Sequence, residues 1–288
     1  MANIFSGLES LGLGNLSEMK LFEEKKKETA QGSAAKAQAE VKEEDLIFDK
    51  TFKCKVCDKE FKTKMVRTGK AKLLAQDSDL RPRYQTVDSL KYDAIVCPNC
   101  GFAALSRFFN YMTDAQAKLI KDNISFSFKG LPAEEGEIWS YDDAIVRHKL
   151  ALVNTVVKRA KASEKAYTCL KLAWLLRGKS ETLPADTQNL ADVKKNLAEQ
   201  EKEYIANAYE GFMDAFSKEQ FPMCGMDEIT MTYLVADLGR QIGKYDEALR
   251  MVARVLMSKN VSDRIKQKTV DLKELIREEK DKAEKAKA

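Results

Sequence analysis

The chain has 288 residues, of which 44% are hydrophobic and 33% charged, so it can bury one sizeable core or two modest ones. No stretch approaches the roughly 20 continuous apolar residues of a membrane-spanning helix, and the N-terminus lacks the basic start and apolar core of a secretory signal. These features indicate a reducing, cytoplasmic location, where six cysteines are expected to bind metal or lie buried. The net charge is only +4, but residues 50–91 carry twelve Lys or Arg against five Asp or Glu, which concentrates basic charge there.

The first 46 residues are predicted to hold an apolar motif and a flexible linker. Residues 26–45 have many charges and almost no large apolar side chains, so burial cannot offset the entropy of ordering them. Residues 4–22, in contrast, contain a cluster of large apolar side chains. Two interpretations stay open for this cluster: a floppy tail, or a short linear motif that folds onto a groove of this chain or of a partner.

Residues 47–128 are predicted to form a small β-rich module. The runs FKTKMVR and AKLLAQD flank Thr68-Gly69-Lys70, a plausible turn, so they are expected to form one hairpin. The run YDAIVC predicts another strand directly before the second cysteine pair.

From Ser140 onward the apolar residues recur with a helical period. Ser140 and Asp143 form a capping-box pattern at the start of the first helix. A second helix is expected from Ser163 to Gly178, where the glycine would act as the stop. Further helices are predicted over 189–220, on both sides of Gly243, and from Ser262 into the charged tail. Residues 140–280 therefore predict an antiparallel helical array.

Part of this array resembles a tetratricopeptide repeat. In the segment ITMTYLVADLGRQIGKYDEALRMVARVL, the matching positions are Val235, Ala236, Gly243, Tyr245 and Ala248. Residues 164–178 resemble the first helix of another unit, but the link to the next helix is longer than the repeat allows. An ordinary helical bundle is the alternative. The predicted fold class is α+β, mainly α: a small zinc-knuckle β module followed by an antiparallel, tetratricopeptide-like array.

Two CxxC pairs carry the clearest chemistry of the sequence. Cys54 and Cys57 stand in CKVC, and Cys97 and Cys100 in CPNC, with 39 residues between the two pairs. Four thiolates are the ligand set of a tetrahedral zinc ion, whereas a redox dithiol would need one pair in a thioredoxin-like βαβ unit, which neither pair has. We therefore predict one structural zinc. A closed four-sulfur site leaves no position for water or substrate, so its role is to hold a module too small to fold on apolar burial alone.

The remaining residues offer few catalytic parts. His148 is the only histidine and falls on the core-facing stripe of its helix, so a packed imidazole is expected and HExxH zinc chemistry is excluded. Cys169 and Cys224 are most simply a buried thiol and a loop thiol. Gly178-Lys179-Ser180 is not a phosphate loop, because Ala173 stands where that motif needs a glycine. A non-enzymatic protein is expected.

A polar cluster lies between the cysteine pairs, in DSDLRPRY: Asp77, Asp79, Arg81, Arg83 and Tyr84. The favoured interpretation is a polar loop with internal Asp–Arg pairs that packs against the zinc knuckles. The alternative is a small anion or peptide-end site built from Arg81, Arg83 and Tyr84.

These motifs resemble a known family. The segment CKVCDKEFKTKMVRTGKAKLLAQDSDLRPRY, followed by KYDAIVCPNCGFAAL, is similar to the bacterial domain-of-unknown-function family 2225. Its members share a CxxC pair, an Asp-rich segment ending in Arg-Tyr, a CPxCG knuckle and a tetratricopeptide-like helical region. The resemblance covers about residues 47–280. It implies an architecture and no activity.

Three functions are compatible with these features. The preferred one is a non-enzymatic, zinc-stabilised interaction or scaffold protein whose helices bind a peptide or protein partner. The expected groove residues are Tyr209, Phe212, Phe216, Tyr233 and Tyr245. The alternative is nucleic-acid binding by the basic module. Its expected contacts are Lys62, Lys64, Arg67, Lys70 and Lys72. An enzyme with an unrecognised site is the third function, against which the single histidine and the lack of a cofactor loop count.

Overall fold

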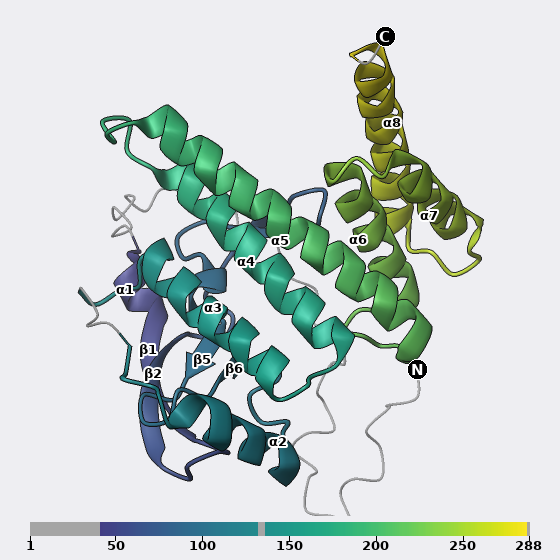
Figure 1. Ribbon diagram of the computed structural model, residues 1–288. Coiled ribbons are helices and arrows are strands. Elements are labelled where there is room, and N and C mark those ends of the chain that lie inside the picture. Colours follow the sequence, from purple (N-terminus) through teal and green to yellow (C-terminus); the bar gives the residue numbers. More distant parts are fainter. Residues whose placement is uncertain (1–40, 132–135, 287–288) are drawn as a thin grey trace, which may run out of the picture. The chain divides into compact units, whose positions relative to one another are not determined.

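The computed structural model describes residues 41–131 and 136–286, and Figure 1 shows a helical array beside a smaller strand-containing module. The apolar motif 4–22 and most of the predicted linker lie outside the described residues. The predicted linker ends earlier than expected, because Glu43–Leu46 form the short helix α1. Leu46 is buried, and the Glu43 carboxylate accepts from the Tyr92 hydroxyl at 2.8 Å, so this turn is tied to the module. The fold class, α+β and mainly α, is confirmed.

The strands of the module form three two-stranded antiparallel sheets. The pairs are β1 (Ile47–Lys53) with β2 (Glu60–Val66), β3 (Leu73–Gln76) with β4 (Pro82–Tyr84), and β5 (Ala94–Val96) with β6 (Ala103–Leu105). The predicted hairpin of β2 with β3 is therefore wrong, although the chain does turn at 68–70. The first cysteine knuckle itself joins β1 to β2 and sets Phe52 opposite Phe61, whose rings both pack in the module core.

Seven α-helices longer than one turn follow in the described chain. They are α2 (Asp114–Ile120, continued by a π turn over Lys121–Ser125), α3 (Tyr141–Val157), α4 (Ala162–Thr182), α5 (Leu190–Lys218), α6 (Glu228–Gln241), α7 (Tyr245–Met257) and α8 (Asp263–Lys285). The predicted capping box of α3 is confirmed, with the Asp143 amide donating to Ser140 Oγ and the Asp143 carboxylate accepting from the Ser140 amide. Gly243 makes the predicted turn between α6 and α7 at a φ of +81°. Helix α2 was not predicted.

Helix α4 does not stop at Gly178 but continues to Thr182, which corrects the sequence expectation. A Cβ atom on residue 178 would lie 2.6 Å from Cε1 of Tyr141. The glycine is therefore explained by the close approach of the Tyr141 ring at the start of α3, rather than by chain termination.

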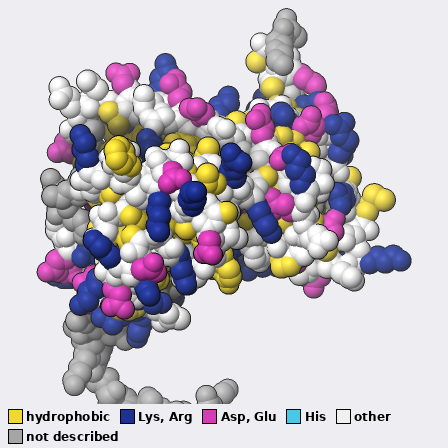
Figure 2. Space-filling model, turned by 60° about the horizontal axis from the view of Figure 1, so that its bottom comes forward, with side chains coloured by type: hydrophobic (Ala, Val, Ile, Leu, Met, Phe, Trp, Pro, Cys, Tyr) yellow, Lys and Arg dark blue, Asp and Glu magenta, His cyan; other side chains and the backbone are white. Residues whose placement is uncertain are grey.

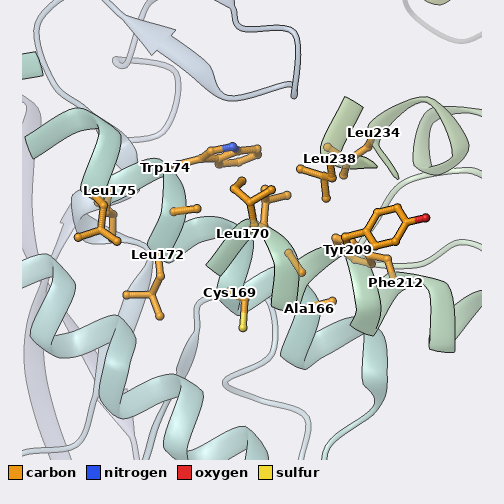
Figure 3. Packing of buried hydrophobic residues seen from close by; sticks show 14 of the residues in the cluster. Ala166, Cys169, Leu170, Leu172, Trp174, Leu175, Tyr209, Phe212, Leu234 and Leu238 are labelled. Atoms are coloured by element: carbon orange, nitrogen blue, oxygen red, sulfur yellow. The ribbon is translucent and has the colours of Figure 1, made fainter. Parts of the chain in front are cut away.

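The largest core lies among α3, α4, α5 and α6 (Figure 3). Helix α4 is the central element, flanked by α3 and α5 (Figure 1), and it buries side chains around most of its circumference. Leu170, Leu172 and Leu175 have no exposed surface. Helix α5 approaches closely because residue 211 is glycine: a Cβ there would lie 2.9 Å from that of Ala166.

This packing overturns the predicted aromatic groove. Tyr209, Phe212 and Tyr233 are at most 2% exposed, and Phe216 and Tyr245 are half-buried against the cores. The hydroxyls of two of these tyrosines are also engaged, since Tyr209 donates to Glu247 and Tyr233 donates to the carbonyl of residue 78. Spacing alone placed these rings on one helix face but did not reveal that neighbouring helices cover it.

The module packs directly on the array. Val96 and Ala103 of the β5–β6 sheet cluster with Ala151 of α3. The Asn154 amide of α3 donates to the carbonyl of Gly101 at 3.0 Å, in the second cysteine knuckle. The boundaries 47–128 and 140–280, and the assignment of the helices as repeats, stay predictions.

Candidate metal centre and the neighbouring loop

Both cysteine pairs have the same backbone conformation. The Cys54 amide donates to the carbonyl of Lys59, and the Asp58 amide donates back to the carbonyl of Cys54. In the second knuckle, the Cys97 amide likewise donates to the carbonyl of Phe102, and the Gly101 amide donates to the carbonyl of Cys97. The residue after each second cysteine has a positive φ, +60° at Asp58 and +72° at Gly101. Position 101 requires glycine for two reasons. Its φ is positive, and a Cβ there would lie 2.7 Å from the Phe128 ring.

The two knuckles bring four sulfur atoms together. The Sγ atoms of Cys54, Cys57, Cys97 and Cys100 all lie within 4.8 Å of one another. Cys54 is 3.5 Å from Cys100 and Cys57 is 3.7 Å from Cys97. A tetrahedral ion with metal–sulfur bonds of about 2.3 Å requires sulfur atoms about 3.8 Å apart. The four cysteines could therefore hold a metal ion.

The electrostatics of the cluster also call for a cation. Hydrogen bonds from Cys100 and Cys54 lower the pKa of the Cys97 thiol to about 2. Hydrogen bonds with Cys54 and Cys97, together with burial, raise the pKa of Cys100 far above its usual value. The sulfur atoms therefore cannot all ionise side by side unless a positive charge lies between them.

An apolar shell surrounds the sulfur atoms. Phe102 and Phe109 are fully buried, and their rings stack with centroids 4.9 Å apart. Ile95, Ile120 and Phe61 complete the same cluster. The Val56 amide donates a hydrogen bond to Cys54 Sγ over 3.3 Å, and thiolates in such sites accept hydrogen bonds of this kind. With four sulfur ligands and this shell, the arrangement suits a structural ion.

The predicted polar cluster lies elsewhere than expected. The loop 77–81 packs against the helical array instead of the cysteine knuckles, which corrects the favoured interpretation. Asp79 is 0% exposed and accepts from Arg177 Nη2 at 2.7 Å and from Trp174 Nε1 at 3.1 Å, both on α4. Burial alone would raise the pKa of Asp79, but the charge and hydrogen bond of Arg177 lower it overall.

The arginines of this loop are occupied by carboxylates. Arg81 Nη1 lies 3.0 Å from Glu181 Oε2, and Arg83 binds both oxygens of Glu181. Arg83 also forms an internal pair with Asp77 at 2.7 Å. The structure thus fills the alternative anion site with protein carboxylates, and half-buried Tyr84 contributes no described hydrogen bond to it. No sequence pattern indicates the helical partners of this loop, which lie about 100 residues away.

The basic residues of the module are spread over several elements. Lys62 and Lys64 lie on β2, Arg67 follows it, Lys70 is in the turn and Lys72 precedes β3. Across the β1–β2 ladder, Asp49 stands opposite Lys64 and Glu60 opposite Lys53. The Arg67 guanidinium lies over the Phe48 ring, 5.4 Å from its centroid. Acidic residues therefore divide the basic face of this sheet.

The single histidine is a packed imidazole, as predicted. His148 is fully buried, and its Nδ1 lies 2.8 Å from the carbonyl oxygen of Ala144. Burial lowers the pKa of His148 to about 4. Burial also raises the pKa values of the Cys169 and Cys224 thiols to about 12. Both thiols are therefore protonated near neutral pH.

The fold and the site define a module whose four clustered cysteines could hold a metal ion, joined to a helical array. A family profile described as an uncharacterised protein conserved in bacteria, domain of unknown function 2225, matches residues 47–283. The chain belongs to this family, as the sequence resemblance indicated. No curated protein and no solved structure matches it. Within the described residues, no helix is both long and apolar enough to cross a membrane.

Proposed function

We propose that the protein is a non-enzymatic, cytoplasmic interaction protein. One structural zinc ion stabilises its cysteine module, and a groove of its tetratricopeptide-like helices binds an apolar segment of a protein partner. Zinc is the metal proposed because tetrahedral sites with four cysteines are typical of it. The exposed surface of α3 is the observation that supports partner binding.

Helix α3 presents apolar side chains to solvent. Val146, Val153 and Val156 are 43%, 50% and 59% exposed. Their spacing of seven and three residues sets them along one face of the helix. Single exposed apolar residues need no explanation, but three in a row beside a groove are typical of an interaction surface.

The groove itself has a volume of about 850 Å³. Leu152 and Val156 of α3 form one wall, Tyr204 of α5 forms the other, and Ala166 and Cys169 of α4 line the floor. Small residues on the floor leave room for side chains of a bound segment. Hydrophobic side chains also reach the surface between charged ones on the face drawn in Figure 2.

The test is a selection on the immobilised full-length protein with a random 12-residue peptide library. Peptides that emerge are synthesised, and their dissociation constants are measured by fluorescence anisotropy. Val156→Asp should weaken binding by about tenfold or more, because it places a charge in an apolar contact. Val270→Asp is the matched control, since Val270 is 37% exposed but lies on α8. Equal binding to both variants contradicts the proposed groove.

Nucleic-acid binding by the basic module is the second candidate. The charge of +7 over residues 50–91 favours it. The acidic residues opposite Lys64 and Lys53 count against it.

A further inference from the structure

A second cavity, of about 890 Å³, lies between the cysteine module and the array. Its walls come from residues 107–116 of the module, from the first turn of α4, and from the loop that holds Pro222, Cys224 and Gly225. Lys161 lines this cavity and also the groove between α3 and α5. The two hollows are therefore adjacent, and one bound segment can extend from the groove into the cavity.

Two cations face this cavity without a protein carboxylate. Within the described residues, neither Arg107 nor Lys161 forms an ion pair or a side-chain hydrogen bond. Among the described residues that line the cavity, Glu164 is the only one with a carboxylate, and the buried ammonium of Lys158 lies 2.7 Å from it. The wall therefore keeps unbalanced positive charge.

The Arg107 guanidinium is held in place by its surroundings. It lies over the Tyr167 ring, 5.2 Å from the centroid. On another side it lies close to Gly225, where an added Cβ would be 3.0 Å from Nη2. These contacts position the group while leaving its N–H donors free of any acceptor in the described chain, so little side-chain entropy is lost when it binds a ligand.

Apolar surface adjoins these cations. Tyr111 is 76% exposed at the rim, and Phe108, Met112 and Pro222 also line the cavity. A cationic centre beside an aromatic and apolar wall complements a carboxylate flanked by a large apolar residue.

We infer that the cavity recognises an Asp or Glu side chain, next to a large apolar residue, in the peptide that the groove binds. This inference rests on the proposed function and names the chemistry of its partner. A carboxylate suits the site better than a phosphate group. The wall offers a single guanidinium and a single ammonium beside the Glu164 pair, whereas phosphate recognition favours denser positive charge.

The experiment uses peptides selected from the random 12-residue library on the full chain. Each acidic peptide is compared with its Asp→Asn or Glu→Gln partner on the wild-type protein and on Arg107→Gln. We expect about a 10- to 100-fold loss when either charge is removed, and little further loss when both are removed. Arg107→Lys should recover part of the affinity. Lys118→Gln, an exposed residue of α2 outside the cavity, is the matched control.

The outcomes separate the two claims. The inference is supported if the selected peptides are acidic and their affinity falls when Arg107 is replaced by Gln. Peptides that depend on Val156 but carry no acidic residue, that bind Arg107→Gln equally well, or that bind only when phosphorylated overturn it and leave the groove standing. A selection without any binder sensitive to Val156→Asp overturns the proposed function and the inference together. Thermal melting of each variant verifies that the fold is kept.

Discussion

In the helical array, the single helix α4 supplies three fully buried leucines, Leu170, Leu172 and Leu175. Neighbouring helices cover it from several sides. The strands of the cysteine module are three to seven residues long and pair only two by two. A two-stranded sheet is at best marginally stable in water. We therefore expect apolar burial to stabilise the array, and we expect the module to depend on the cross-link that its four sulfur atoms would supply through a metal ion.

Replacing Cys97 by Ser tests this contrast with the largest expected effect. Loss of one thiolate should remove the metal and cost on the order of 10 kcal/mol of the folding free energy of the module. Elemental analysis should give one zinc per wild-type chain and none per variant. Hydrogen exchange should then become fast in residues 47–128 while the core of α4 stays protected.

Cys224→Ser is the control for that experiment and should keep the zinc. Phe212→Ala provides the opposite case, because it should cost about 3–5 kcal/mol in the array without changing the metal content. A wild-type chain without zinc, or unchanged exchange in Cys97→Ser, would refute the structural role of the metal.

Asp79→Asn tests how strongly the two regions are coupled. The substitution removes the charge of a fully buried carboxylate, one of two that lie 2.7 Å from the Arg177 guanidinium; the other is Glu201. A loss of about 3–5 kcal/mol is expected in urea unfolding. Asp142→Asn is the surface control: Asp142 is 70% exposed in its pair with Lys179, and the expected cost is below about 1 kcal/mol. Equal effects of the two substitutions would show that the buried pair does not couple the regions.

His148 predicts a pH dependence of the array. Its folded-state pKa is about 4, below the ordinary value of 6.5, so the unfolded chain takes up a proton first as the pH falls. This contribution to stability is present above pH 6.5 and is lost between about pH 6.5 and 4, by about 3 kcal/mol. His148→Leu should flatten the slope of the unfolding free energy in that window. Because the chain has one histidine, an unchanged slope in the variant would contradict the assignment.

The smallest effect is expected for nucleic acid. If Lys62, Lys64, Arg67, Lys70 and Lys72 contact phosphates, log affinity should fall with log salt at a slope of about −3 to −4, with little sequence preference. We expect weak binding that physiological salt removes. Changing Lys62, Lys64 and Arg67 together to Glu should abolish it without altering the zinc content. Submicromolar, salt-resistant binding to one RNA or DNA would instead favour the nucleic-acid function.

What the sequence predicted well depends on local chemistry. The cap at Ser140, the turn at Gly243 and the two CxxC knuckles are each set by a few neighbouring residues. What it missed depends on contacts between distant segments. Nothing near Asp79 indicates that Trp174 lies beside it, and nothing in the spacing of Tyr209 and Phe212 shows that other helices cover them. The groove beside α3 was missed for the same reason: the spacing of valines along a helix does not show which of them are exposed and which are buried.

The contacts of the loop 77–81 also set an order of events during synthesis. The partner residues Trp174, Tyr233 and Lys268 follow it by 95 to 191 positions. At about 5–20 residues per second, ribosomes need roughly 10–40 s to add the last of these. All four cysteines have been made by residue 100, before α4 begins. The nascent module can therefore close around a metal ion well before the helices that hold its loop exist.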